Sequence, residues 1–324
     1  MAVCWFVGLT TLDVVHRASA RPGPNEKITA TRQDVAAGGP AANAAVTAAA
    51  CGARAVLVSA LGAGPVAQAA RADLDDAEVQ VHDVAGPDEG FPLAVSAVLV
   101  DEATGERSVV SADAALAVAP APSPGALDAL PRPDVVLLDG HHPAIARAVL
   151  DFVEGLRPRP QVVLDGGRWR PVFAELLPAA DVAALSADFT VPADVAPGAA
   201  DAAHGALLLG ARSVVVTHGG DPVTWALARR RDDGAVEAGE RGTVPVPPVD
   251  VRDSLGAGDA FHGALAVALA RGAGLQDACA TAVSVAGARV GKVGPRAWLA
   301  HLPERSQPHG GTARPASDSS RGDG

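Results

Sequence analysis

The sequence predicts an α/β protein in which helices cover both faces of a mostly parallel sheet, with a small second sheet beside it. Short β-branched runs alternate with Ala- and Leu-rich stretches of helical length, which is typical of βαβ units. Two segments without helical periodicity interrupt this alternation, Lys27–Val35 and Leu93–Ser111. They indicate that a smaller β element is inserted into the domain.

The strands of the main sheet are expected where short apolar runs occur without polar alternation, because strands buried on both faces read as continuous apolar stretches. These runs are Val3–Val7, Ala55–Ser59, Val135–Asp139, Val162–Asp165 and Ser213–Thr217. The first of them is not part of a signal peptide, since no basic residue precedes it and Asp13 interrupts the apolar stretch.

Helices are expected where Ala and Leu dominate and turn residues flank the stretch. The predicted helices are Ala41–Cys51, Pro143–Leu156, Ala199–Leu209, Gly258–Arg271 and Leu275–Val290. Gly52 follows the first of them and is a suitable residue to end a helix.

The inserted element is predicted to be a β lid. Leu93–Asp101 and Glu106–Ser111 form a hairpin around a turn at residues 103–105. Together with the N-terminal strand pair they place the lid at about residues 14–35 and 92–111, within one domain of residues 1–304. Residues 305–324 contain almost nothing apolar, so we expect them to form a disordered tail.

Composition excludes several classes of function. The chain of 324 residues has 26 Lys and Arg against 37 Asp and Glu, a net charge of −11, which argues against nucleic acid or an anionic membrane as partner. Hydrophobic residues make up 48% but aromatic residues only 3%, so a base-stacking platform is not expected. Three distant cysteines fit neither a disulfide scaffold nor a zinc site, and we expect a cytoplasmic protein.

The most informative motif is the run from Asp253 to Gly263, which joins a strand-like segment to an apolar helix. Gly256 and Gly258 let the backbone amides of the turn point in one direction, and the helix N-terminus adds partial positive charge. Asp259 follows in the first helical turn. A carboxylate beside an anion site suits the removal of a proton from an attacking hydroxyl, although Asp259 could also merely cap the helix.

A second motif, Gly38-Gly39-Pro40-Ala41-Ala42-Asn43, opens the first long helix. Paired glycines permit close approach of a ligand to the backbone, and the Asn43 amide can both donate and accept hydrogen bonds. Asp13 follows the first strand, where open α/β sheets place ligand residues. Taken singly, each of these features is compatible with a turn or a cap.

Together, these motifs resemble the ribokinase-like (phosphofructokinase B-type) carbohydrate kinase family. The order and spacing match over residues 3–302, including Gly8 to Asp13, Gly38 to Asn43, Val216-Thr217-His218-Gly219-Gly220, and Gly256-Ala257-Gly258-Asp259. Lys27 and the run from Asp259 to Leu265 resemble the ketose-type and sulfofructose kinases. The resemblance implies the ribokinase-like three-layer α/β/α sandwich with a β lid. The exposed face of such a lid is an unpaired sheet that could pair with another copy, so we expect a homodimer through the lid.

The resemblance also implies roles for individual residues in an ATP- and Mg²⁺-dependent sugar kinase. Asp259 would be the catalytic base, and the amides of Gly256, Ala257 and Gly258 would stabilise the transferred phosphoryl group. Sugar hydroxyls would be held by Asp13, Lys27, Gly39 and Asn43. The nucleotide would contact Thr217, Gly219 and Gly220, with the adenine covered by the helix around Ala282 and Ala286. Asp253 matches a position that in many relatives helps to bind a monovalent cation such as K⁺.

Two family motifs are altered. The usual G-x-D-x-x-G after the second strand is here Gly62-Ala63-Gly64-Pro65-Val66-Ala67, without its Asp. The family usually carries N-x-x-E before its nucleotide-binding part, where the Glu helps to organise Mg²⁺. Here the corresponding stretch is Ser186-Ala187-Asp188-Phe189, so the Glu is missing and only Asp188 could replace it.

The sequence predicts a neutral acceptor, ketose-like or a pentose. In sulfofructose kinases an Asn and an Arg join the Lys in holding the sulfonate, whereas the matching residues here are Ser111 and His141. Because His141 follows a predicted strand, we expect it near the sugar. Two alternatives remain open at this point: a nucleoside kinase of the same family, and a non-catalytic sugar-binding protein that retains the fold.

Overall fold

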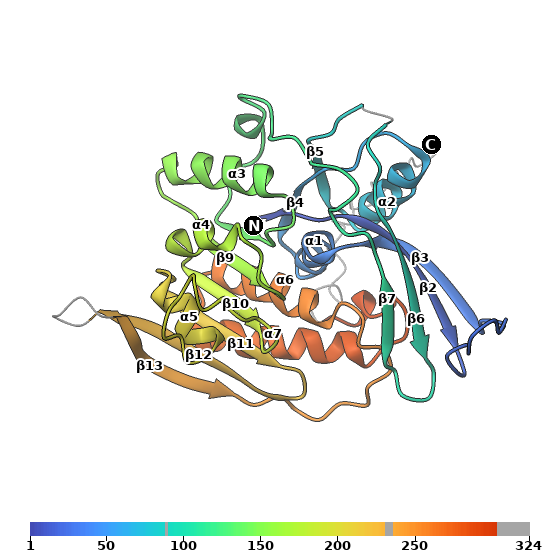
Figure 1. The fold of residues 1–324 in the computed structure, drawn as a ribbon. Helices are drawn as coiled ribbons and strands as arrows, with labels where there is room; N and C mark the ends of the chain where they lie inside the picture. The colour runs from blue at the N-terminus through green and yellow to red at the C-terminus, as the bar shows by residue number, and fades with distance from the viewer. Residues whose placement is uncertain (88–89, 231–235, 303–324) are drawn as a thin grey trace, which may run out of the picture.

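Two β-sheets and the helices around the larger one make up the computed structural model (Figure 1). It describes residues 1–87, 90–230 and 236–302. The predicted tail, residues 305–324, lies outside the described residues. Among the residues that are described, no helix is both long and apolar enough to cross a membrane.

The larger sheet has nine strands, and every pair of neighbours from β11 to β5 is parallel. β12 and β13 continue it in antiparallel fashion at one edge. In spatial order the strands are β13 (Val236–Val244), β12 (Asp221–Arg230), β11 (Ser213–His218), β10 (Val182–Ser186), β9 (Gln161–Gly166), β8 (Val135–Leu138), β1 (Val3–Val7), β4 (Arg54–Ser59) and β5 (Gln80–Asp83).

Helices cover both faces of this sheet, which confirms the predicted three-layer architecture. Alternate side chains of β1 separate the two cores, with Cys4 and Phe6 on one face and Trp5 and Val7 on the other. The first face carries α1 (Pro40–Ala50), α2 (Pro65–Asp76), α6 (Ala257–Ala270) and α7 (Leu275–Val290). The second carries α3 (Pro143–Gly155), α4 (Phe173–Leu176) and α5 (Ala202–Leu208). Short 3₁₀ turns lie at Leu127–Ala129, Leu177–Ala179 and Leu299–His301.

The predicted strands and helices are all present, but the prediction was incomplete. It missed the helices α2 and α4 and the strands β5, β10, β12 and β13. It also began the helix α5 too early, at Ala199. That helix starts after Asp201, whose side chain accepts a hydrogen bond from the His204 N–H at 2.8 Å and so caps the N-terminus.

The smaller sheet has four strands in the order β3 (Arg32–Gly38), β2 (Thr11–Ala18), β6 (Val95–Asp101) and β7 (Arg107–Val110). β6 and β7 form the predicted hairpin, with Val100 opposite Arg107. The inner face packs Val15, Val98 and Val100 against Leu255, just ahead of α6. The small sheet therefore stands over the segment that leads into α6.

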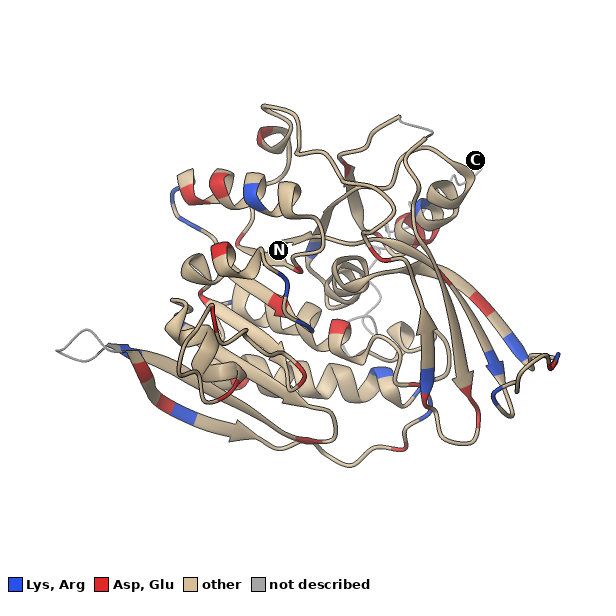
Figure 2. Ribbon diagram, in the orientation of Figure 1, with Lys and Arg blue, Asp and Glu red and all other residues tan. Residues whose placement is uncertain are grey.

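Charged residues of both signs are interspersed along the described chain (Figure 2). The small sheet shows this mixture clearly: Arg32 is paired with Asp34 on β3 at 2.8 Å, and Arg17 of β2 is paired with Asp253. Both of these basic side chains thus form ion pairs within the chain.

Helices α1 and α6 pack unusually closely because small residues line their contact. A Cβ atom on Gly263 of α6 would lie 2.4 Å from the carbonyl oxygen of Ala44 and 2.8 Å from Thr47 Cβ, so only glycine fits there. The facing residues of α1 are mostly alanines, among them Ala41, Ala44 and Ala48, all fully buried. This close packing brings the N-termini of the two helices together.

We therefore expect Gly263→Ala to destabilise the protein by about 1–3 kcal/mol through overpacking, more than the roughly 0.5–1 kcal/mol that alanine gains in a helix. The matched control is Gly287→Ala in α7, where the new Cβ would lie 3.6 Å from Val249 Cγ1, an ordinary contact. Denaturant unfolding should show a loss of stability for the first variant only. Equal stability of the two variants would contradict the packing argument.

Candidate active site

The start of α6 forms an anion-binding turn. Gly256 precedes the helix in a left-handed conformation with φ of 71°, which favours glycine. The first-turn amides of a helix have no partner within that helix and carry its partial positive charge. A Cβ on Gly258 would meet nothing within 4 Å, so the space in front of this turn is open. The predicted cradle of Gly256, Ala257 and Gly258 thus has the right form for an anion.

Asp259 lies in the first turn of α6 and is held from α1. The Asn43 side-chain amide donates a hydrogen bond to Asp259 Oδ2 at 2.8 Å. Two residues that are 216 positions apart in the chain are therefore in direct contact. The sequence predicted both residues for the site, and the structure brings them together.

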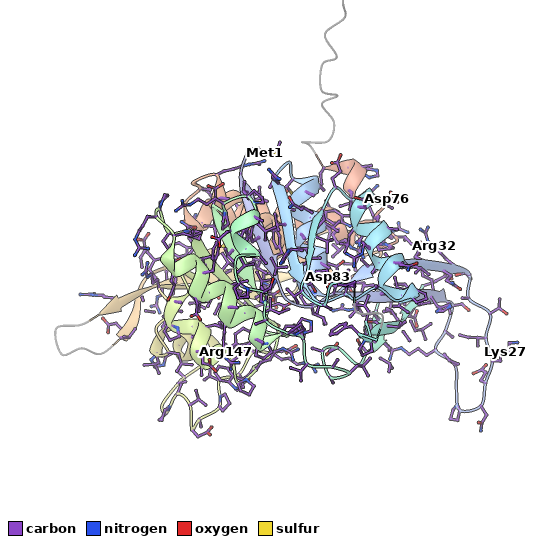
Figure 3. All side chains as sticks on the ribbon, turned by 90° about the horizontal axis from the view of Figure 1, so that it is seen from above. Met1, Lys27, Arg32, Asp76, Asp83 and Arg147 are labelled. Atoms are coloured by element: carbon purple, nitrogen blue, oxygen red, sulfur yellow. The ribbon has the colours of Figure 1, made fainter. Side chains whose placement is uncertain are left out.

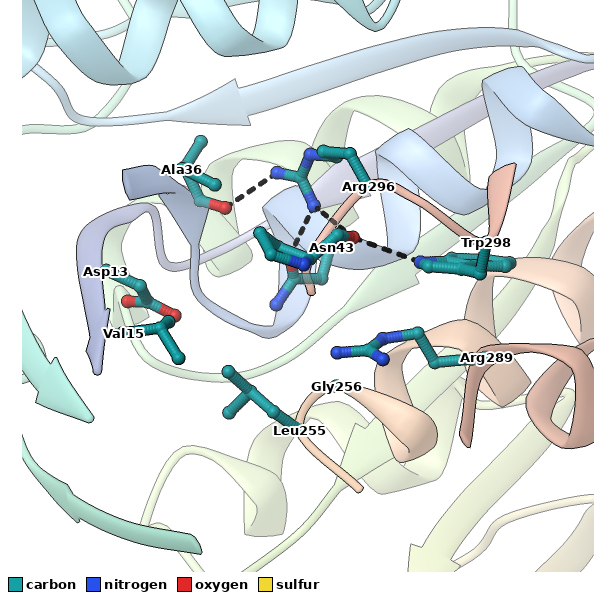
Figure 4. Close-up of a pocket in the computed structure, with 11 residues that line it drawn as sticks. Asp13, Val15, Ala36, Asn43, Leu255, Gly256, Arg289, Arg296 and Trp298 are labelled. Carbon is teal, nitrogen blue, oxygen red and sulfur yellow. Dashed lines mark hydrogen bonds between the residues drawn. The ribbon is translucent and has the colours of Figure 1, made fainter. Parts of the chain in front are cut away.

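Arg296 fixes the orientation of Asn43 (Figure 4). Its Nη1 donates to Asn43 Oδ1 at 3.4 Å, which leaves the amide nitrogen of Asn43 to face Asp259. Arg296 is itself anchored by an ion pair with Asp73 at 2.7 Å and by a hydrogen bond of 2.7 Å to the carbonyl oxygen of Ala37. Arg296 was missed in the sequence analysis because it belongs to no spaced motif.

Its surroundings make Asp259 a weak acid that is easily protonated. Burial raises the pKa of Asp259 to about 6, and the charge of Asp165 acts in the same direction. The hydrogen bond from Asn43 and the positive groups of His262 and Arg107 oppose this rise. A carboxylate with this pKa is ionised at neutral pH yet basic enough to take up a proton.

A buried His–Asp pair lies behind Asp259. His262 Nδ1 is 3.0 Å from Asp165 Oδ2, and the two residues are 5% and 6% exposed. Burial lowers the pKa of His262, but the charge and hydrogen bond of Asp165 and the charge of Asp259 outweigh it and raise the pKa. His262 belongs to the motif after Gly256 and Asp165 ends β9, so each had a local signal, but their pairing depends on the fold.

Asp13 lines the pocket that opens beside Asn43 (Figure 4). It accepts a hydrogen bond from the Thr11 hydroxyl at 2.7 Å, and burial raises its pKa. A Cβ on Gly38 would lie 2.1 Å from Asp13 Oδ2, so this glycine leaves room for the carboxylate. Gly39 starts α1 with φ of 93°. The pocket is lined by Asp13, Val15, Ala36, Ala37, Asn43, Leu255, Gly256, Arg289, Pro295, Arg296 and Trp298.

His141 lies after β8 beside the buried Asp139. Asp139 accepts hydrogen bonds from the amides of Leu9, Ala41 and His141 and so joins the ends of β1 and β8 to the start of α1. Burial alone would raise the pKa of Asp139, but the charge and hydrogen bonds of His141 and the Leu9 amide lower it to about 2. The Nε2 atom of the His141 ring contacts the Arg170 guanidinium. His141 is thus held in place, though it does not line the pocket beside Asn43.

Lys27 is placed away from the residues just described. It is exposed in the connection between β2 and β3, at the outer end of the molecule (Figure 3). It lines a cavity on the outer face of the small sheet with His16, Ala97 and Leu99, whereas Asp13 lies on the inner face. Within one chain, the structure does not bring Lys27 together with Asp13 and Asn43.

The predicted nucleotide residues lie at the end of β11, just beyond it, and on α7. Gly219 and Gly220 are exposed, and added Cβ atoms would meet nothing within 4 Å, so the backbone there is open to a ligand. Thr217 is partly buried and donates to the carbonyl oxygen of Leu185 at 3.4 Å. On α7, Ala282 is fully buried in the core and only Ala286 retains exposed surface.

The altered N-x-x-E motif lies in an aromatic cluster. Phe189, at the position of the family Glu, is 1% exposed and packs edge-on against Trp169 and Phe173 at ring distances of 5.8 and 5.5 Å. It therefore offers no ligand to a metal. Asp188 is exposed, and its amide is bonded to the Ser186 hydroxyl. No group of three His, Cys, Asp or Glu side chains suited to a metal occurs in the described part of the chain.

Asp253 is buried between two arginines. Arg17 of β2 and Arg289 of α7 approach its two carboxylate oxygens at 3.3 and 3.6 Å. Neither arginine belongs to a sequence motif. The one clue in the sequence is that each is a charged residue at a position where the strand or helix pattern faces inward.

Comparison with known proteins identifies the family. A model of the pfkB family carbohydrate kinases matches residues 1–301. The chain belongs to this family. Its enzymes are phosphotransferases with an alcohol group as acceptor, and the chain is thus a carbohydrate kinase.

Solved structures of similar proteins share the ribokinase-like fold. A ribokinase described as putative, from Agrobacterium tumefaciens, is 24% identical with a TM-score of 0.70, over 92% of this chain and 94% of its own. A ribokinase from Arabidopsis thaliana is 21% identical with a TM-score of 0.68, over 91% and 94%. An aminoimidazole riboside kinase from Salmonella enterica is 20% identical with a TM-score of 0.63, over 91% and 96%. At these identities the likeness establishes the fold alone.

We expect Asp259→Asn to lower kcat for phosphoryl transfer by roughly 10²–10⁴, the usual contribution of a positioned proton acceptor. Nucleotide affinity should change little, because an amide keeps the shape of the carboxylate. The matched control is Asp277→Asn, which removes a carboxylate from the first turn of α7, outside this site, and should leave kcat unchanged. Retention of more than about a tenth of wild-type kcat by Asp259→Asn would exclude Asp259 as the proton acceptor.

Proposed function

We propose that the protein transfers the γ-phosphoryl group of ATP to a hydroxymethyl group of a small neutral sugar, ketose-like or a pentose. The observation that carries this proposal is the position of Asp259, a carboxylate with raised pKa in the first turn of a helix whose amides form an open anion cradle. Binding alone would not place a negative charge there. Proton removal from an acceptor hydroxyl does require it.

In the proposed reaction, Asp259 takes the proton as the acceptor oxygen attacks the γ-phosphorus. The bond between the γ-phosphorus and the oxygen that joins it to the β-phosphorus breaks, and ADP and the sugar phosphate result. The amides of Gly256, Ala257 and Gly258 face the charge that develops on the transferred group. The hydrogen bond from Asn43 keeps the carboxylate of Asp259 aimed at the acceptor.

ATP as donor is supported by the open backbone at Gly219 and Gly220, and the Arabidopsis thaliana ribokinase was solved with ribose and ATP. Mg²⁺ neutralises phosphate charge when it is bound with the nucleotide. We propose that phosphate oxygens and water are its main ligands, because Phe189 offers none and the described residues provide no acidic cluster.

The neutral acceptor is supported by the charges around the pocket. Each guanidinium that lines it has a carboxylate as neighbour: Arg296 is paired with Asp73, and Arg289 shares Asp253 with Arg17. Asp13 adds a further carboxylate, which would repel an anionic group but accept hydrogen bonds from hydroxyls. We propose that Asp13 and Asn43, with the backbone at Gly39, hold the sugar hydroxyls.

We further propose that the small sheet acts as a lid and as a homodimer interface. Its inner face stands over the segment before α6, so closure would keep water from the phosphoryl group. Its outer face exposes Val35, Val95 and Val110, which are 49%, 44% and 76% exposed. Burial of these side chains against a second copy would remove apolar surface from water and cover the edge of the sheet.

The test is ADP release with a panel of acceptors: fructose-type ketoses, aldopentoses, sulfofructose, fructose 6-phosphate and nucleosides, with Asp259→Asn as the blank. We expect kcat/KM for a neutral sugar to exceed that for every anionic sugar by about tenfold or more, since no unpaired cation lines the pocket. Preference for an anionic sugar would contradict the neutral-acceptor proposal and would assign Arg170 and His141 as its anchors. Preference for a nucleoside would replace the sugar by the aminoimidazole riboside type of substrate.

A further inference from the structure

Three charged side chains form a buried cluster where the small sheet meets the segment before α6. Arg17 comes from β2, Asp253 precedes α6, and Arg289 lies in the last turn of α7. They are 5%, 1% and 3% exposed. Two guanidinium groups therefore share one carboxylate away from water, and the cluster carries a net positive charge.

Both carboxylate oxygens of Asp253 are occupied by N–H groups. Oδ2 lies 3.3 Å from Arg17 Nη1 and accepts from the Gly294 amide at 3.1 Å. Oδ1 lies 3.6 Å from Arg289 Nη2 and accepts from the Leu255 amide at 3.0 Å. Each oxygen thus has one guanidinium and one backbone donor as neighbours.

The nearby carbonyl oxygens are occupied in the same way. Arg17 Nη2 donates to the carbonyl oxygen of Arg252 at 2.9 Å. Arg289 Nη1 donates to the carbonyl oxygens of Asp253 at 3.4 Å and Lys292 at 3.2 Å. Hard cations are held by carboxylate and carbonyl oxygens. The two carboxylate oxygens of Asp253 and the carbonyl oxygens of Arg252, Asp253 and Lys292 each face a guanidinium nitrogen instead, so this arrangement does not fit a bound K⁺.

We infer that the guanidinium groups of Arg17 and Arg289 take the place of a monovalent cation at Asp253, and that this kinase works without K⁺. An arginine is charged at every physiological pH and cannot dissociate from the protein. Arg17 and Arg289 hold Asp253 in a fixed position, and Arg17 also holds the carbonyl oxygen of Arg252. Because Leu255 and Gly256 follow directly, the same contacts set the start of the anion cradle.

The small sheet supplies a second tie to this segment. Arg107 of β7 donates to the hydroxyl of Ser254 at 3.0 Å and to its carbonyl oxygen at 3.3 Å. The Ser254 hydroxyl in turn donates to the carbonyl oxygen of Gly105 at 3.4 Å. Arg17 and Arg107 therefore join two strands of the small sheet to residues 252–254. Both are positioning residues, since they act on the cradle through Asp253 and Ser254.

Thermal melting and turnover in matched salts test the inference. Only the turnover measurement rests on the proposed function, since melting temperatures need no substrate. The wild type is melted, and assayed with its best acceptor, in about 100 mM KCl, NaCl or tetramethylammonium chloride, a concentration that fixes ionic strength. We expect equal melting temperatures and kcat/KM values within about twofold, because a ligand that binds only the native state would raise the melting temperature. A K⁺-specific rise in wild-type melting temperature, or activation of about tenfold by K⁺, would overturn the inference.

The variants Arg289→Ala and Arg17→Gln each free oxygens around Asp253. We expect K⁺, but not tetramethylammonium, to raise their melting temperatures and to restore part of their lost kcat. Arg252→Ala is the control, because its side chain is 61% exposed and pairs only with Asp250, and it should behave like the wild type in every salt. If none of the acceptors is phosphorylated, the kinase proposal is contradicted. The melting temperatures of the same proteins then still decide the cation inference. Variants that keep full kcat in all salts would contradict the positioning role.

Discussion

The arrangement of the site depends on the hydrogen bond between Asn43 and Asp259, which joins the starts of two helices from opposite ends of the chain. Two helix N-termini that converge create a positive region, and a carboxylate placed there must be stopped from occupying the anion site itself. Asn43 does this by holding Asp259 from the side. Arg296 and Asp73 then fix Asn43, so the geometry of the carboxylate depends on a chain of side chains and not on one contact.

The unusual composition follows from the same constraint. Helix starts can converge only if the helices approach closely, and alanines along α1 together with Gly263 on α6 permit this. A chain poor in aromatic residues is thus suited to this packing. Three of the aromatic side chains, Trp169, Phe173 and Phe189, form one cluster on the other face of the main sheet. There Phe189 is committed to ring contacts and offers no ligand to a metal, which is why the proposed function leaves Mg²⁺ to phosphate oxygens and water.

Much of the fold could be predicted because the central strands β1, β4, β8, β9 and β11 are apolar on both faces. β10 was missed, since its Ala-Leu-rich sequence resembles a helix. β12 and β13 were missed because both carry charged residues. Within the site, glycines and Asp259 carry local signals of helix starts. The arginines do not: Arg17, Arg289 and Arg296 gain their meaning from partners more than two hundred residues away or on another element. Lys27 is the opposite case. The family resemblance predicted it for the site, but within one chain it lines a different cavity, away from the pocket.

The central claim, that Asp259 is a carboxylate poised to accept a proton, is tested most directly by its own titration. Carboxyl carbons of aspartate labelled with ¹³C can be followed by NMR between about pH 2 and 8, a range that spans the ordinary and the raised pKa, in the wild type and in Asp259→Asn. We predict one carboxyl that titrates with a pKa of about 6 in the wild type and is absent from the variant. A titration of Asp259 at its ordinary pKa of 3.8 would contradict the account, because such a carboxylate would be too weak a base for the proposed step.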